Sequence, residues 1–143
     1  MSSNSLVDAL KEVAHSDHAI LTEAIHKSPY ETGARREQGQ ASIVLRPATN
    51  EEMSAMVAIC VQMNVEVVPQ SANTGVVWGS TPDTTGNQVL LSLDRMSKLF
   101  EVDVVNRSVR VGAGVRLSEL NAKLEQHGLF FPIDLGADPM VGG

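Results

Sequence analysis

A run of small residues after a valine-rich stretch is the strongest candidate for binding chemistry. The segment Pro69-Gln70-Ser71-Ala72-Asn73-Thr74-Gly75 directly follows the valine-rich residues 65–68. Short side chains let consecutive backbone N–H groups converge on one anion, as in phosphate-binding nests. Asn73 and Thr74 add short hydrogen-bonding side chains, and the pair Gly79-Ser80 continues this composition. An ordinary surface connection rich in turn residues is the alternative interpretation.

Two familiar nucleotide-binding motifs are incomplete. The passage Gly112-Ala113-Gly114-Val115-Arg116-Leu117 has a leucine where the dinucleotide fingerprint requires its third glycine. Gly75 is not followed by the Gly-Lys-Ser/Thr ending of a P-loop. Neither a standard NAD site nor an NTPase is therefore expected.

Metal and nucleophilic chemistry have little support. His15 and His18 are three residues apart on a predicted helix, but no third ligand is evident, and a solvated helix face explains them. No Ser-His-Asp arrangement is recognisable. The single cysteine, Cys60, excludes an internal disulfide and is expected to pack inside the protein. We therefore predict no metal site and no catalytic residue within this chain.

Composition excludes several classes of partner. The chain has 143 residues, which suits one domain, and its net charge of −6 argues against nucleic acid. Aromatic residues make up only 3%, too few for base-stacking surfaces. No apolar run approaches the length of a membrane span, and no secretory leader is recognisable. A cytoplasmic location is the default expectation.

The candidate loop must be positioned by a β-α-β unit. A strand is predicted over 43–45, followed by a helix that begins with a Thr49–Glu52 capping box and continues to about Met63. A parallel strand over 65–68 should then be stopped by Pro69. Ligands of α/β units bind beyond the carboxyl ends of such strands, where this loop starts. The predicted buried face of the helix comprises Met53, Met56, Val57, Cys60 and Val61.

The remaining elements follow from periodicity and turn signals. One or two helices are predicted over 5–27, with Ile20, Leu21, Ala24 and Ile25 on the second and Pro29 ending it. Residues 28–40 suggest a connecting loop. A strand over 89–93, a hairpin over 100–111, a helix over 116–127 ended by Gly128, and the start of a strand over 129–131 complete the pattern.

Residues 41–143 resemble a known family. Leu45–Glu52, Val68–Gly75, Val111–Val115 and the closing segment Pro132-Ile133-Asp134-Leu135-Gly136-Ala137 with Val141-Gly142-Gly143 are similar, in this order, to the FAD-binding domain of the vanillyl-alcohol oxidase and p-cresol methylhydroxylase superfamily. The greatest similarity is to its D-2-hydroxyacid dehydrogenases. This group includes D-lactate dehydrogenases, D-2-hydroxyglutarate dehydrogenase and the FAD subunit of glycolate oxidase.

The resemblance implies a fold and a domain division. It implies the α+β, p-cresol-methylhydroxylase-type FAD-binding fold, in which a small parallel β-α-β sheet packs with an antiparallel sheet. Residues 1–40 would be an N-terminal helical segment and linker, and residues 41–143 a truncated FAD-binding domain, incomplete at its C-terminus. Any substrate or metal residues would lie past Gly143.

The resemblance also implies a function. FAD would accept a hydride at N5 from a D-2-hydroxy acid, giving the 2-oxo acid, and a quinone, cytochrome or electron-transfer flavoprotein would take the electrons. The loop carries no His or Cys for a covalent link, so non-covalent FAD is expected. A homodimer stays open. The implied cofactor-binding residues are Pro69, Gln70, Ser71, Ala72, Asn73, Thr74, Gly75, Gly79, Ser80, Pro132, Asp134, Leu135, Gly136, Ala137, Val141 and Gly142.

Two departures leave alternatives open. Many members of the family have Gly-Gly where this chain has Ser71-Ala72, and Trp78 stands where they often have glycine. A non-catalytic binding module with a degenerate flavin site is therefore one alternative. A superfamily flavoenzyme that acts on another alcohol is the other. Trp78 would either cover a ligand or pack over the loop.

Overall fold

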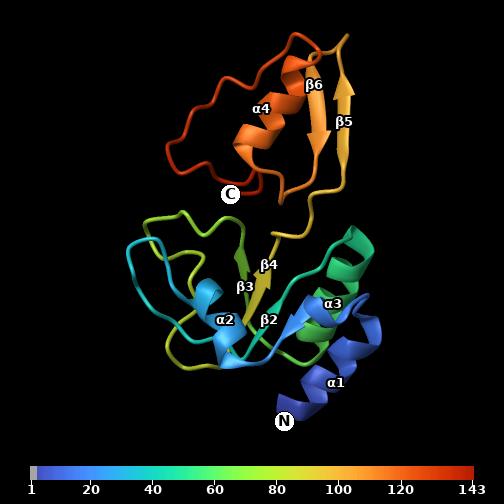
Figure 1. Cartoon of the computed structure of the whole chain (residues 1–143). Coiled ribbons are helices and arrows are strands. Elements are labelled where there is room, and N and C mark those ends of the chain that lie inside the picture. The colour runs from blue at the N-terminus through green and yellow to red at the C-terminus, as the bar shows by residue number, and fades with distance from the viewer. Residues whose placement is uncertain (1–2) are drawn as a thin grey trace.

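The computed structural model describes residues 3–143 and has two lobes, with the C-terminus between them (Figure 1). The first lobe contains a four-stranded sheet of order β1-β2-β4-β3, and the second contains the two-stranded sheet β5-β6. This is the predicted α+β fold. The strands are β1 (Ile20–Leu21), β2 (Ile43–Leu45), β3 (Val67–Gln70), β4 (Val89–Ser92), β5 (Phe100–Asp103) and β6 (Ser108–Val111). The helices are α1 (Ser3–Val13), α2 (Ala24–Glu31), α3 (Asn50–Gln62) and α4 (Leu117–Glu125), with a 3-10 turn at Asp17–Ala19.

Helices cover both faces of the first sheet, which explains its wholly apolar central strands. Ile43 and Leu45 of β2 pack with α1 and α3, whereas Val44 lies in a separate cluster with Leu90 and with Tyr30 of α2. The predicted parallel strands β2 and β3 are parallel, but they do not touch each other. Each pairs with β4, which lies between them.

The cap of α3 is only partly the predicted one. The Thr49 hydroxyl accepts the Glu52 N–H at 3.1 Å, but the Glu52 carboxylate binds elsewhere. It accepts the N–H of Ala48 and the N–H of His15, each at 2.7 Å, and is fully buried. Glu52 therefore ties the turn after α1 to the start of α3. The inward prediction is confirmed at Met56 and Cys60 and wrong at Val61, which is 71% exposed, because the buried stripe follows the four-residue spacing Glu52-Met56-Cys60.

The N-terminal prediction is wrong between Ile20 and Pro29. Ile20 and Leu21 form β1, antiparallel to β2, and their side chains enter the clusters on opposite faces of the sheet. A helix would have put both on one side. The helix α2 begins later, at Ala24, and continues past Pro29 to Glu31.

Two further strand predictions are wrong. Pro69 does not stop β3, which continues to Gln70, because β3 is an edge strand and proline costs no ladder bond on an outer edge. Residues 129–131 form no strand. Asn121 of α4 instead accepts the N–H of Phe131 at 2.7 Å and donates to its carbonyl at 3.3 Å, so this segment is held on the helix.

The second lobe forms as predicted and docks through two glycines. Leu117, Leu120 and Leu124 of α4 are buried against the β5–β6 hairpin. A Cβ on Gly112 would lie 2.1 Å from the Met96 carbonyl oxygen, and one on Gly114 would lie 2.5 Å from that of Leu93. The backbone of the second lobe thus lies directly on the segment that leaves β4. None of the helices between residues 3 and 143 has the length and apolar content needed to span a bilayer.

Candidate functional site

The loop predicted to bind an anion leaves the carboxyl end of β3 at the edge of the sheet that faces the second lobe (Figure 1). Its first residues enclose a cavity of about 330 Å³. The C-terminal pair Gly142-Gly143 closes one side, and the Gly143 backbone lies near Ser71. The structure thus brings these loop residues into one lining: Pro69, Gln70, Ser71, Ala72, Asn73, Thr74, Gly75, Val77, Gly79 and Ser80, with Leu93.

The backbone N–H groups at the start of this loop are not engaged by the protein. Among residues 3–143, no acceptor receives a hydrogen bond from the backbone N–H groups of residues 71–77. Residues 71–74 are half-buried and residues 75–77 are exposed, so their N–H groups are left to water or to a ligand. The Ser71 hydroxyl oxygen is itself buried without a partner among the described residues. Consecutive free donors with no carboxylate in the lining are suited to an anion.

Ser71 and Ala72 do not strain the loop. The residues with positive φ here are Asn73, at 55°, and Trp78, at 65°. Ser71 and Ala72 are outside this region, so their Cβ atoms carry no backbone penalty. The positive φ at Trp78 explains why glycine suits that position. Trp78 is 63% exposed and does not line the cavity, so its side chain does not cover it.

The glycines of the loop face open space. A Cβ on Gly79 would meet nothing within 4 Å, and one on Gly75 would meet only the Ser80 hydroxyl, at 3.9 Å. Neither glycine has a positive φ. Nothing in the fold itself therefore requires glycine at either position. The space in front of them is available to a ligand.

The second predicted cofactor segment is divided by the fold. Gly142 lines the loop cavity, whereas Pro132, Asp134, Leu135 and Gly136 line a separate cavity of about 670 Å³ beside α4. Ala137 and Val141 line neither cavity. The Val141 N–H donates to the Val115 carbonyl, so this residue holds the C-terminal segment in place.

Asp138 is the reason that this segment lies on α4. Its carboxylate accepts the Ser118 N–H and the Ser118 hydroxyl, each at 2.8 Å, and so caps the helix. The Ser118 backbone N–H is the main cause that lowers the pKa of Asp138, followed by the Ser118 hydroxyl, with a smaller contribution from Arg116.

We expect acid to weaken this cap. A carboxyl whose pKa is lowered by folding stabilises the protein above its ordinary pKa and loses that contribution as pH falls through the folded value. Asp138→Asn cannot be protonated and keeps one acceptor. The difference in unfolding free energy between wild type and Asp138→Asn, measured in urea, should shrink between pH 7 and about pH 3. A difference independent of pH would contradict the assignment.

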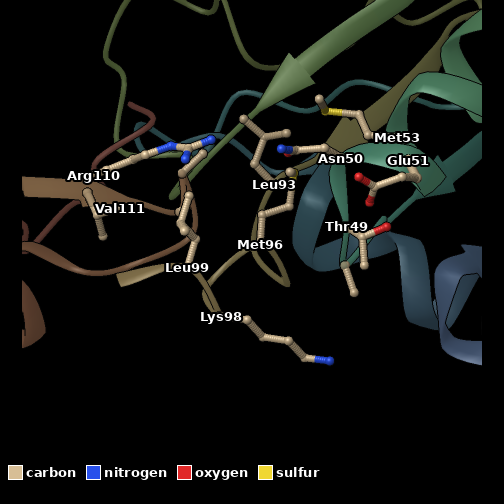
Figure 2. Close-up of a pocket in the computed structure, with 13 residues that line it drawn as sticks. Thr49, Asn50, Glu51, Met53, Leu93, Met96, Lys98, Leu99, Arg110 and Val111 are labelled. Carbon is tan, nitrogen blue, oxygen red and sulfur yellow. The ribbon is translucent and has the colours of Figure 1, made fainter. Parts of the chain in front are cut away.

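A third cavity, of about 560 Å³, lies between the lobes and was not anticipated from sequence (Figure 2). The start of α3, the segment after β4 and the end of β6 line it. Lys98 and Arg110 bring positive charge, and Arg110 lies 3.6 Å from the Glu101 carboxylate. Leu93 lines both this cavity and the loop cavity, so the two are neighbours.

A network beside the loop holds α2 against β2 and β4. The Tyr30 hydroxyl donates to the Asp94 carboxylate at 2.9 Å, and Arg46 donates to the same carboxylate at 2.8 Å. Burial and the Asp94 carboxylate raise the pKa of Tyr30 to about 12, so its hydroxyl stays a donor at physiological pH. Tyr30 contacts the loop after β3 through Gln70, which is 40 residues away, so no local sequence pattern could have predicted this contact.

The structure is thus an α+β domain with a cradle, the loop of residues 71–80, whose backbone N–H groups at 71–77 have no acceptor in the described part of the chain. The sequence model of the FAD binding domain family matches residues 41–143. The chain therefore belongs to this family.

Solved structures share the fold. The chain superposes on alkyldihydroxyacetonephosphate synthase with a TM-score of 0.88 at 18% identity, covering 100% of this chain and 29% of that one. For p-cresol methylhydroxylase with substrate bound, the TM-score is 0.72 at 21% identity, covering 88% and 25%.

Two sequence relatives of the chain are dehydrogenases. D-2-hydroxyglutarate dehydrogenase of Danio rerio is 36% identical over 70% of this chain and 18% of its own length. D-lactate dehydrogenase of Anaerostipes hadrus is 28% identical over 96% of this chain and 29% of its own length. The chain therefore spans only 18% and 29% of the length of these two relatives. It belongs to the FAD binding domain family and is similar in sequence to D-2-hydroxyglutarate and D-lactate dehydrogenases.

Proposed function

We propose that this chain binds FAD non-covalently, with the pyrophosphate over residues 71–77. The observation that carries the proposal is the row of unengaged backbone N–H groups beside the unpartnered Ser71 hydroxyl at the carboxyl end of β3. A pyrophosphate would satisfy these donors without any charged side chain. The lining holds no His or Cys, and burial raises the pKa of the Cys60 thiol on α3, so no covalent attachment point is at hand.

The proposal extends to the reaction of the whole protein. When bound, FAD supplies the redox chemistry, and the chain supplies binding and orientation. Identities of 36% and 28% to D-2-hydroxyglutarate and D-lactate dehydrogenases support a D-2-hydroxy acid as the substrate. A quinone, a cytochrome or an electron-transfer flavoprotein is the proposed electron acceptor. The cytoplasmic location remains a prediction.

Gly75→Val is expected to abolish flavin retention. The branched side chain would fill the open space in front of the cradle, while the fold has room for it. The unfolding free energy should therefore change by less than about 0.5 kcal/mol. Absorbance of the purified protein near 450 nm, before and after denaturation, measures bound and released flavin.

The matched control is Thr84→Val, at an exposed position farther along the same connection. It should retain flavin as wild type does. Flavin content unchanged in Gly75→Val would contradict the loop as the pyrophosphate site. Flavin that stays with the denatured protein would contradict non-covalent binding.

Substrate is tested on the protein at its full natural length. Anaerobic addition of D-lactate or D-2-hydroxyglutarate should bleach the flavin absorbance, and the L-enantiomers should not. Bound flavin that neither acid reduces would overturn the proposed substrate class.

A further inference from the structure

The side-chain amides of Gln70 and Asn73 form hydrogen bonds within the protein itself. The Gln70 side-chain amide donates to the Tyr30 carbonyl and to the Ser80 carbonyl, each at 2.8 Å. Its residue is 2% exposed. Because both neighbours are carbonyl oxygens, only the amide nitrogen of Gln70 can face them.

Asn73 makes a parallel connection. Its side-chain nitrogen donates to the Thr32 carbonyl at 2.8 Å, and its side-chain oxygen accepts the Ser80 hydroxyl at 3.1 Å. Both side chains thus connect the start of the loop to Ser80, at the other end of the loop. Each also connects it to the C-terminal end of α2, at Tyr30 or at Thr32 just beyond the helix.

The two acceptors at α2 are backbone carbonyls in a segment that is itself fixed. The Tyr30 side chain is anchored to Asp94, just beyond β4, and Arg46 shares that carboxylate. This anchor belongs to residues 24–32, which precede the stretch matched by the FAD binding domain family. The position of the 71–80 loop therefore depends on hydrogen bonds to residues 24–32, which lie outside the matched stretch.

We propose that Gln70 and Asn73 are positioning residues that brace the 71–80 loop between α2 and Ser80, so that its unengaged backbone N–H groups keep one fixed arrangement beside the cavity. The inference rests on the proposed FAD site, and it assigns these two side chains to the protein and not to the cofactor. Without the braces, the free N–H groups of residues 71–77 have no internal acceptor to keep them in place.

Trp78 makes the test possible without any cofactor. It is the only tryptophan of the chain and lies within the braced loop. Its fluorescence anisotropy therefore reports the mobility of this loop on the nanosecond timescale. Gln70→Leu removes both donors of the first brace. Asn73→Gly removes the second brace and keeps the positive φ of 55° accessible.

Both variants should lower the anisotropy of Trp78 in the folded, ligand-free protein. Each should weaken FAD binding, measured by flavin fluorescence, by about ten- to a hundredfold, as expected for two lost hydrogen bonds. The double variant should lose less than the product of the two single losses, because both braces hold one loop. Gln88→Leu is the control, since Gln88 also binds a loop residue, the N–H of Asp83, but at the other end of β4. It should change neither quantity.

The outcomes separate the two proposals. Wild-type anisotropy and wild-type FAD affinity in both variants would overturn the bracing role. A loss of unfolding free energy with no change in Trp78 anisotropy or FAD affinity would reduce both residues to ordinary packing and would also overturn it. Lowered anisotropy in a protein whose wild type binds no FAD would uphold the brace and refute the proposed function. If Gln70→Leu fails to fold, Asn73→Gly alone decides.

Discussion

Gly112→Ala should lower the unfolding free energy by roughly 3 kcal/mol or more, at the upper end of overpacking effects. A Cβ at this position would lie 2.1 Å from the Met96 carbonyl oxygen and 3.3 Å from the Ser97 Cα. Both neighbours are backbone atoms, so no side-chain rotation relieves the contact. The Gly112 N–H also donates to the Leu99 carbonyl at 2.9 Å, and moving the strand would lengthen this bond. Urea unfolding measures the effect.

The matched control is Gly136→Ala. A Cβ there would meet nothing within 4 Å, and the residue has no positive φ. Its unfolding free energy should stay within about 0.5 kcal/mol of wild type. If Gly112→Ala were equally harmless, the close approach of β6 to the segment after β4 would be refuted. Gly112→Ala should also disturb the loop cavity that Gly142 lines, because the carbonyl of Ala113, next to Gly112, accepts the Gly142 N–H at 2.9 Å.

Glu52→Gln should cost about 2–3 kcal/mol of unfolding free energy, although the side chain keeps its size. The wild-type carboxylate accepts two backbone N–H groups, from Ala48 and from His15, in a fully buried place. A glutamine offers one oxygen, so its NH₂ group must face one of these donors. One buried N–H then loses its acceptor, and the link between α1 and α3 is weakened.

The neighbouring Glu51→Gln is the control for helix charge. Glu51 lies in the same first turn of α3 but is exposed, so it should cost less than about 1 kcal/mol. Hydrogen exchange of the His15 amide adds a local readout and should accelerate in Glu52→Gln alone. Equal effects of the two substitutions would mean that Glu52 acts only through the helix dipole.

Local sequence determined much of this protein. The Thr49 cap, the hairpin at Asn106-Arg107, the inward leucines of α4 and the positive φ of 66° at Gly128 depend on residues within a few positions of one another. The small-residue composition of the loop after β3 was also readable, and in the structure the backbone N–H groups of residues 71–77 have no acceptor among the described residues. That this loop binds an anion stays a prediction. The family followed from short motifs that stand in a fixed order.

Tertiary structure decided what depends on distant segments. Ile20 and Leu21 form a strand only because β2 offers an edge, and β4 takes the place between β2 and β3 from a later part of the chain. The side chains of Gln70 and Asn73 were predicted to bind the cofactor. In the structure their amide nitrogens donate hydrogen bonds to the backbone carbonyls of Tyr30 and Thr32 instead. Likewise, the Asp138 cap carries Pro132–Gly136 away from the loop and leaves Gly142 beside it. Hydrophobic periodicity and turn residues depend on positions close together in the sequence. A hydrogen bond between residues 40 positions apart changes neither pattern, so it cannot be predicted from them.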